Sequence, residues 1–592
     1  MKFAEVAETF EEMTKTTKRL ELSTLLSDLL KRSGEDLKII CYLLQGKLLP
    51  DYYGIETGMS DKLILEAFSK EYGKPRTVLD KQFGKLGDLG SLAEALGSRR
   101  VQSGLFSSDL TVSDVYSTLM EIARTEGKGS ISQRIGLFER LIRNSTPIEA
   151  KYITRILTGK LRLGVSDSTI LKAMTEAFAT SDLGEQIEVA FNFHPDMGRL
   201  AEILRDGKLE QIRAAAPDLM IPAKVMLAER LPSLDQILEK MGGRAAFEYK
   251  YDGMRVQIHK EGEKVRIFSR GSEETTANFP DIVDAAIRTF QGRDLIVDGE
   301  AVPFNPETGE MYPFQAVSQR RGRIYNLDEM SRDIPLTVFL FDILYLDGKP
   351  TVMESYPERR KLLASTLVEN DQFKLATVLV SSELGEIEAF FEKAISEGCE
   401  GIVAKNVSDA STYRAGARGW LWIKFKRDYK RELGDSLDLV VIGAFNGHGR
   451  RKGTFGALLL ASYDQDQDLF ESVCKLGTGF KDDVLFNLPK MMESYMEKEK
   501  PSRVTSGIMP DIWIYPSIVL EVVGAEITLS PVHNCAFGKL SPGAGLALRF
   551  PRFTGRFRDD KKPEDATSTS EIVEMYQNQK KNIGKGPVTS PN

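Results

Sequence analysis

The segment EYKYDGMR at 248–255 groups residues whose types and spacing suit covalent chemistry. If it enters as a β-strand, the period of two places Glu248, Lys250 and Asp252 on one face. A lysine is a nucleophile only when deprotonated. Burial or positive charge, from Arg255 or a bound divalent metal, lowers a lysine pKa, whereas a carboxylate alone raises it. A half-exposed strand with a surface salt bridge would show the same pattern, so spacing alone leaves both interpretations open.

Six further segments follow along the chain, and each carries charged or aromatic residues suited to a nucleotide. They are Ser269-Arg270-Gly271, Asp298-Gly299-Glu300, Phe341-Asp342-Ile343-Leu344-Tyr345, Glu400-Gly401-Ile402-Val403-Ala404-Lys405, Trp422-Ile423-Lys424-Phe425-Lys426, and Arg549-Phe550-Pro551-Arg552 followed by Arg556, Arg558 and Lys561. With the KxDG lysine motif, this ordered set resembles the covalent nucleotidyltransferase superfamily of DNA ligases and mRNA capping enzymes. The resemblance covers nearly the whole chain and points to ATP-dependent DNA ligases of the archaeal and eukaryotic type.

The resemblance implies a role for each matched residue. Lys250 attacks the α-phosphate of ATP, releases pyrophosphate and carries AMP as a phosphoramidate, while divalent metal and cationic side chains neutralise the developing charge. Glu248 accepts a hydrogen bond from the adenine amino group, and Phe341 packs against adenine. Further ATP contacts are implied for Arg255, Arg270, Glu300, Arg418 and Lys424; contacts to Mg²⁺ or Mn²⁺ for Glu300 and Glu400; and contacts to nucleotide phosphate for Lys426, Arg552, Arg556, Arg558 and Lys561.

Three of these assignments have simple structural alternatives. Glu300 also fits a turn carboxylate, although the alternation places it on one strand face with Asp298. Glu400 also fits a solvated turn residue before a buried strand. Phe341 competes with Phe339, which the alternation places on the same face as an ordinary core aromatic.

The basic run ARGWLWIKFKRDYKRELG at 417–434 also has two interpretations. A charge run is usually a solvated strand end, but here the charges alternate with the buried-looking residues Trp420, Trp422 and Phe425, which favours phosphate binding. Upstream, the family often has proline where this chain has Ala415. Arg418 nevertheless stays in register with the family pattern.

Three regions must position these residues. Residues 1–217 show helical periodicity in LSTLLSDLLKRSG, SDVYSTLMEIARTEG and SISQRIGLFERLIRN, and prolines at 217 and 222 mark a linker. Residues 218–433 alternate short β-patterned runs with helices such as EIEAFFEKAISEG, which predicts an α+β adenylation domain. Residues 434–580 contain five or more strands with Gly- and Pro-rich turns, typical of a β-barrel. We therefore predict a multidomain chain: an all-α DNA-binding domain, the adenylation domain, a C-terminal OB-fold and a disordered tail at 581–592.

The amino-acid composition limits the possible classes of function but does not identify one. Lys and Arg total 79 against 86 Asp and Glu, a formal net charge of −7, so any DNA-binding surface must be local. The four cysteines are scattered, with no zinc or disulfide spacing, which favours a reducing cytoplasm. Neither a signal-peptide core nor an apolar run near 18 residues is found. We expect a cytoplasmic monomer from a prokaryote of archaeal type.

The helical region points to duplex DNA as the partner, because capping enzymes and minimal ligases generally lack it. Its segment LTGKLRLGV at 157–165 resembles the signature of the domain that grips DNA in the larger ligases. Lys160 and Arg162 there are candidates for contact with the DNA backbone, or else belong to a basic turn between helices. The peptide at Gln102, Leu105 and Phe106 resembles a sliding-clamp motif, a short pattern that also arises by chance.

Competing classes make different demands on the sequence. An RNA ligase or capping guanylyltransferase would not need the helical region or the cluster at 549–561. A non-catalytic DNA-binding scaffold need not retain Lys250, Glu300 and Glu400 together. An NAD-dependent ligase would carry a four-cysteine zinc module, and an ordinary P-loop hydrolase a GxxxxGK[ST] loop; this chain has neither.

Overall fold

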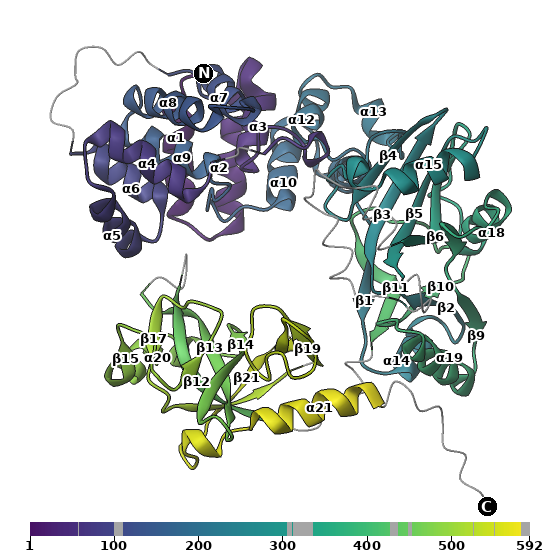
Figure 1. Ribbon diagram of the computed structural model, residues 1–592. Coiled ribbons are helices and arrows are strands. Elements are labelled where there is room, and N and C mark those ends of the chain that lie inside the picture. The colour runs from purple at the N-terminus through teal and green to yellow at the C-terminus, as the bar shows by residue number, and fades with distance from the viewer. Residues whose placement is uncertain are drawn as a thin grey trace, which may run out of the picture. The chain divides into compact units, whose positions relative to one another are not determined.

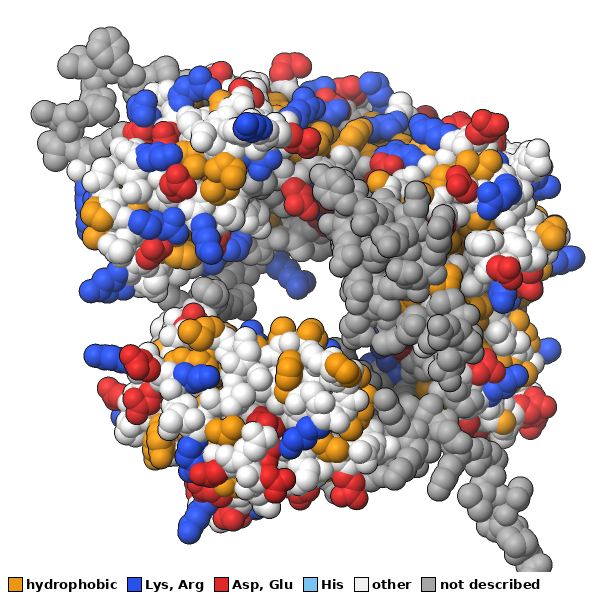
Figure 2. Space-filling view, in the orientation of Figure 1, with side chains coloured by type: hydrophobic (Ala, Val, Ile, Leu, Met, Phe, Trp, Pro, Cys, Tyr) orange, Lys and Arg blue, Asp and Glu red, His pale blue; other side chains and the backbone are white. Residues whose placement is uncertain are grey.

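The computed structural model describes residues 1–56, 59–99, 110–304, 311, 335–426, 436–447, 453–524, 526–549 and 551–581. The chain divides into two compact units, Met1–Phe425 and Lys426–Asn592. Within the described ranges, every helix is too short or too polar to cross a membrane. Lys and Arg side chains are interspersed with acidic ones on the face in Figure 2, as the small net charge leads us to expect. Of the predicted tail at 581–592, Lys581 is the last residue of a helix, and residues 582–592 lie outside the described residues.

The first part of unit 1 is built from helices (Figure 1). They are α1 (Phe3–Thr14), α2 (Arg19–Arg32), α3 (Leu37–Leu44), α4 (Asp61–Tyr72), α5 (Arg76–Leu86), α6 (Leu89–Gly97), α7 (Val112–Arg124), α8 (Ser130–Arg143), α9 (Pro147–Leu157), α10 (Asp167–Phe178), α11 (Gly184–Phe193), α12 (Met197–Arg205) and α13 (Leu209–Arg213). The three helices predicted from periodicity are confirmed as α2, α7 and α8. Capping boxes start α7 at Thr111 and α9 at Thr146, satisfying backbone N–H groups that a helix start leaves unpaired.

Residues 227–426 form two sheets. Their strands are β1 (Leu227–Arg230), β2 (Ala245–Lys250), β3 (Met254–Glu261), β4 (Lys264–Ser269), β5 (Leu295–Pro303), β6 (Leu336–Leu346), β7 (Lys349–Pro350), β8 (Phe373–Leu375), β9 (Val378–Ser381), β10 (Gly401–Asn406) and β11 (Arg418–Lys426). The first sheet has the order β1-β11-β10-β2-β9 and the second β4-β3-β5-β6-β7, where β8 also pairs with β6. The alternation of strands and helices predicted for this region is therefore confirmed, and the strands belong to two different sheets.

Helices cover the outer face of each sheet, and the inner faces of the two sheets pack against each other. On the first sheet, α19 (Leu384–Ser396) packs Phe391 against Phe425 of β11, with ring centroids 4.8 Å apart, and α14 (Leu234–Lys240) lies beside α19. On the second, α15 (Pro280–Thr289) and α18 (Tyr356–Thr366) contribute Ile282 and Leu363 to its apolar core. The inner faces share a smaller cluster that includes Phe341 and Trp422. Polar side chains among these inner residues are thus enclosed between two sheets.

The segment before β1 is fastened to the inner face of the second sheet by buried polar side chains. The Met220 N–H donates to His259 Nδ1 at 3.1 Å, and the Ala223 N–H donates to Gln257 Oε1 at 2.8 Å. His259 Nε2 lies 3.0 Å from the same Gln257 oxygen. Because Nδ1 accepts a hydrogen bond, Nε2 must carry the proton and donate. Burial lowers the pKa of His259 to about 3, which keeps the ring neutral.

This neutral histidine predicts a loss of stability in mild acid. The folded pKa of about 3 lies below the unfolded value of 6.5, so its contribution is complete above pH 6.5 and lost as pH falls toward 3. Between pH 6 and pH 4 the loss is about 2–3 kcal/mol. Urea unfolding at several pH values should show a shallower pH dependence for His259→Gln than for the unaltered chain. Parallel curves would contradict the buried neutral ring.

The second unit is a curved sheet with a separate strand pair. Its elements are β12 (Leu437–Asn446), β13 (Phe455–Asp464), β14 (Leu469–Leu476), α20 (Asp482–Met492), β15 (Met496–Glu497), β16 (Val504–Thr505), β17 (Ile512–Ile514), β18 (Val519–Val523), β19 (Glu526–Ser530), β20 (Gly545–Arg549), β21 (Arg552–Phe557) and α21 (Thr569–Lys581). β12 pairs with β13, β17 and β18, and β18 also pairs with β21, whereas β19 pairs with β20 alone. The consecutive strands β18 and β19 therefore belong to different sheets, although only a few residues separate them in the sequence.

Candidate active site

Lys250 is the last residue of β2, where that strand pairs with the start of β10. Its ammonium forms an ion pair with the Glu400 carboxylate, and the Glu400 N–H donates to the Lys250 carbonyl at 2.8 Å. Both side chains are about a quarter exposed, at 25% and 29%. The register pairs Gly401 with Lys250 and Val403 with Glu248, so Glu248 and Lys250 share the inner face. Glu400 is thus a direct partner of the lysine rather than a solvated turn residue.

The prediction that Asp252 shares this strand face is wrong, because β2 ends at Lys250 and residues 251–253 turn toward β3. Gly253 makes the turn possible: a Cβ there would lie 2.4 Å from the carbonyl oxygen of Ala301. The Asp-Gly half of the motif therefore links the two sheets at the point where Lys250 ends the first.

Arg255 and Glu300 lie side by side on the second sheet, as register partners of β3 and β5. Burial raises the pKa of Glu300 to about 7; Glu400 and Asp252 act in the same direction, against the opposing positive charges of Lys250 and Arg255. These interactions place Glu300 in the same electrostatic group as the lysine. A carboxyl that is half neutral near pH 7 is an unusual feature and marks a candidate functional site.

Arg255 is the hub of a buried hydrogen-bond network. Its guanidinium donates to Asp298 Oδ2 at 2.6 Å and to the Met226 carbonyl at 3.0 Å. Tyr413 donates its hydroxyl proton to the same Asp298 oxygen at 2.7 Å. The guanidinium also lies 5.1 Å from the centroid of the Phe341 ring. Asp298 thus holds Arg255 in place beside an aromatic ring of the inner face.

A β-bulge distinguishes Phe341 from Phe339. In the pairing of β5 with β6, Gly299 lies opposite Leu340 and Asp298 opposite Asp342, so Phe341 is the extra residue. A bulge of this kind redirects a side chain. Phe339 stacks on Tyr251 with centroids 4.0 Å apart, whereas Phe341 meets Trp422 edge-on at 6.1 Å. Phe341, not Phe339, therefore lies among the cations of the inner face.

Glu248 is only 2% exposed and is surrounded by donors. Its Oε2 forms an ion pair with Lys405 at 2.6 Å. Its Oε1 accepts hydrogen bonds from the Tyr356 hydroxyl at 2.6 Å and from Arg360 at 3.2 Å. Lys405, Tyr356 and Arg360 had no role in the sequence interpretation, although Lys405 closes a recognised motif. The spacing of Tyr356 and Arg360, four residues apart on α18, was the available signal for one shared helix face.

The remaining cations of unit 1 lie on other elements of the two sheets. Arg270 directly follows β4 and is exposed, and Arg418 begins β11 and is also exposed. Lys424 lies within β11, as the register partner of Arg230 on β1. The expectation that Trp420 is buried is wrong: it is 44% exposed and lies under the Lys240 ammonium at 4.6 Å, where the β1 register is irregular.

The cations of the C-terminal motif gather around two carboxylates of the second unit. Asp438 Oδ2 accepts from both Arg558 and Lys561 at 2.7 Å, and Arg556 lies 3.5 Å from Glu521. Asp438 and Glu521 are register partners on β12 and β18. Arg552 begins β21 and is exposed, and Lys426 is the last residue of β11.

The predicted DNA-contacting residues lie in the loop after α9. The Lys160 ammonium is 3.3 Å from Asp61, and Arg162 donates to the Gly87 carbonyl at 3.2 Å. Arg162 has a φ of 58°, in the left-handed region that disfavours a side chain. Gln102, Leu105 and Phe106 of the possible clamp peptide lie outside the described residues.

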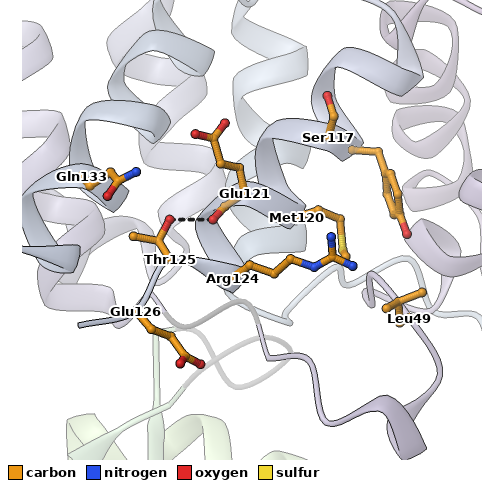
Figure 3. A pocket seen from close by; sticks show the side chains of 9 residues that line it. Leu49, Ser117, Met120, Glu121, Arg124, Thr125, Glu126 and Gln133 are labelled. Carbon is orange, nitrogen blue, oxygen red and sulfur yellow. Dashed lines mark hydrogen bonds between the residues drawn. The ribbon is translucent and has the colours of Figure 1, made fainter.

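A hollow of about 730 Å³ opens in the helical region, around the C-terminal end of α7. Figure 3 shows Arg124 extended toward Leu49, and Thr125 hydrogen-bonded to the Glu121 carbonyl at 2.7 Å. Its wall mixes Arg124 with the acidic residues Glu121 and Glu126. It contains none of the residues predicted for catalysis or nucleotide binding.

Known proteins resemble this chain along its whole length. Family models match residues 2–175 (DNA ligase N terminus), 225–426 (ATP dependent DNA ligase domain) and 451–561 (ATP dependent DNA ligase C terminal region). A DNA ligase of Thermoplasma volcanium is 58% identical over 583 residues, 98% of this chain and 99% of that relative. DNA ligase 2 of Thermofilum pendens is 45% identical over 589 residues, 98% of each.

A solved structure titled Pmar-Lig_PreS3 has a TM-score of 0.53 at 16% identity, covers 93% of this chain and 99% of its own, and supports the fold alone. The family models give the chain an N-terminal, an adenylation and a C-terminal region in the order the motifs require. Full-length identity to curated relatives agrees with that order. The chain belongs to the ATP-dependent DNA ligase family.

Proposed function

We propose that this chain seals nicks in duplex DNA through AMP carried on Lys250. Lys250 Nζ attacks the α-phosphate of ATP and pyrophosphate leaves; the AMP then passes to the 5′-phosphate at the nick. The 3′-hydroxyl attacks that phosphate, forms the phosphodiester bond and releases AMP. The observation that carries the proposal is the meeting of Lys250, Glu300, Glu400 and Arg255 at the facing ends of two sheets.

The carboxylates around Lys250 suit both proton transfer and a divalent cation. Lys250 must lose a proton before it attacks, and Glu400, its direct ion-pair partner, is the base in contact with it. Glu300 and Glu400 would hold Mg²⁺ or Mn²⁺, which usually takes one or two carboxylates together with substrate phosphates. The raised pKa of Glu300 fits such a site, because burial disfavours the charged carboxylate until a cation is bound beside it. A bound cation would supply positive charge against the α-phosphate.

The other residues of the inner faces are suited to the nucleotide. We assign Glu248 to accept from the adenine amino group and the redirected Phe341 ring to pack against the base; their position on the inner faces supports this assignment. We assign the nucleotide's ribose and phosphates to the remaining predicted cations and carboxylates: Arg255, Arg270, Glu300, Arg418, Lys424, Lys426, Arg552, Arg556, Arg558 and Lys561. Charge-assisted contacts of this kind position phosphate in a water-poor site.

We further propose that the helical region, residues 1–217, is an all-α DNA-binding domain, followed by the adenylation domain at 218–433 and an OB-fold at 434–580. The family's usual roles are DNA replication, repair and recombination. We also propose a monomer in the cytoplasm; four buried free cysteines fit a reducing compartment, and the clamp peptide stays a prediction.

A direct test compares nicked substrates. With ATP and Mg²⁺, the protein should seal a nick in duplex DNA at least about tenfold faster than the same nick in duplex RNA, measured by gel electrophoresis of a 5′-labelled strand. The helical region supports this preference. Equal or faster sealing of RNA would favour an RNA ligase instead.

Arg162 offers a test of the DNA-binding loop that separates function from folding. Arg162→Gly removes the steric strain of a side chain in the left-handed backbone conformation. The free energy of unfolding should therefore be unchanged or higher by about 1 kcal/mol, reduced by whatever the lost contact with Gly87 contributes. If Arg162 contacts a phosphate, affinity for nicked DNA should fall and the salt dependence of binding should lose about one counterion. Fluorescence anisotropy at several salt concentrations measures both. An unchanged slope would remove Arg162 from the DNA contact.

A further inference from the structure

One of the residues that contact Glu248 is a buried cation that the nucleotide roles leave unused. Lys405 is 2% exposed and bonds two groups at once: the Glu248 carboxylate at 2.6 Å and the Phe341 carbonyl at 3.1 Å. Three aromatic rings surround its ammonium, with centroids at 4.4 Å for Trp422, 4.8 Å for Phe341 and 4.9 Å for Tyr356. All three distances lie within the range of cation–π attraction. These contacts together hold the Lys405 ammonium in one position.

The same ammonium links the two residues assigned to the nucleobase. Through Glu248 it holds the hydrogen-bonding group, and through the bulged Phe341 backbone it holds the ring that packs against the base. From the opposite side, α18 supplies Tyr356 and Arg360 to the other oxygen of Glu248. The carboxylate can neither rotate nor shift without breaking one of these contacts.

We propose that Lys405, Tyr356 and Arg360 are positioning residues that make Glu248 a fixed hydrogen-bond acceptor, and thereby select a 6-aminopurine nucleotide over a 6-oxopurine one. This inference rests on the proposed function, in which the base lies against Glu248. An ionised carboxylate has no proton to donate and about four lone-pair sites, of which the three donors occupy three. The remaining site attracts an amino group and repels a carbonyl oxygen.

The donors that contact Glu248 are what make the site discriminate between 6-aminopurine and 6-oxopurine nucleotides. Three donors from two elements hold both oxygens of Glu248, so in this arrangement the side chain serves only as a hydrogen-bond acceptor. Without Lys405, the Glu248 carboxylate would be free to rotate away from the base and so tolerate a 6-oxo group. A site built to bond one polar group of a ligand discriminates strongly against a ligand that lacks that group, because the polar group of the site is then left unpaired.

The test measures covalent labelling of the full chain with ATP and with ITP, and compares the two values of kcat/KM. Lys405→Met keeps the side-chain length and should lower the ATP-to-ITP ratio about tenfold or more. Tyr356→Phe removes one hydroxyl, keeps the ring, and should lower the ratio by a smaller factor. Lys374→Met, at an exposed lysine of β8, should leave the ratio unchanged.

A double variant separates positioning from general support of the fold. Because Lys405 acts through Glu248, adding Lys405→Met to Glu248→Gln should lower the ratio no further. Equal losses with ATP and ITP in both Lys405→Met and Tyr356→Phe would overturn the inference. If Lys405→Met fails to fold, Tyr356→Phe decides. Absence of labelling by the unaltered chain with ATP would instead refute the proposed function.

Discussion

Lys250→Ala is expected to abolish the covalent AMP adduct, with a loss of at least about 10³-fold in its rate of formation. The side chain is the only one proposed to bond the α-phosphate, and its neighbours Glu400 and Glu300 are carboxylates that cannot replace an amine. Incubation with α-labelled ATP and Mg²⁺, followed by denaturing electrophoresis, measures the adduct. In the unaltered chain the adduct should survive alkali and hydroxylamine, as a phosphoramidate rather than an acyl phosphate.

A nicked DNA whose 5′-phosphate already carries AMP is the matched control substrate for this variant. Sealing of that substrate does not need the lysine nucleophile, so Lys250→Ala should retain a measurable part of the activity that it loses with ATP. Lys374→Ala, at an exposed lysine of β8 to which no role is assigned, should label normally. Persistent labelling of Lys250→Ala, mapped to another residue, would move the nucleophile elsewhere.

The linear motifs predict which strands carry the chemistry, because alternation and motif order are local properties of the sequence. They predict the β2 strand and the shared face of Glu248 and Lys250. They fail where the chain departs from regular geometry. Asp252 leaves the face because Gly253 turns the chain past Ala301, and Phe341 diverges from Phe339 because one residue bulges from the β5 pairing. The pattern of apolar and polar residues along the chain is the same with or without the turn at Gly253 and the bulge at Phe341. Alternation alone therefore cannot reveal either feature.

The supports of the site depend on long-range contacts and are harder to predict. Lys405 meets Glu248 only because β10 pairs with β2, and Tyr356 reaches it only because α18 is placed on the second sheet. Helix α21 in the second unit was also missed, although Ile572 and Tyr576, four residues apart, both enter its apolar core. The helical pattern was present there, but the surrounding strands favoured an all-β interpretation.

Glu300→Gln should stabilise the metal-free protein at pH 8 while it lowers adduct formation at least about 100-fold. The folded pKa of about 7 lies above the unfolded value of 4.5. The contribution to stability is therefore complete below pH 4.5 and lost as pH rises through 7. Glutamine imitates the neutral carboxyl at every pH. The variant should be more stable by up to about 3 kcal/mol at pH 8, and by less than about 1 kcal/mol at pH 5.

Urea unfolding in a chelator at the two pH values measures this difference, and added Mg²⁺ identifies its cause. If Glu300 helps to hold the cation, Mg²⁺ should raise the stability of the unaltered chain at pH 8 more than that of Glu300→Gln, because only the carboxylate gains a partner. Equal stabilities at pH 8 in chelator would contradict the raised pKa. A gain in stability with undiminished labelling would separate Glu300 from the chemistry. The opposite effects on stability and activity follow from one property, a buried carboxylate whose charged form is disfavoured in the free protein and is favoured when a cation is bound beside it.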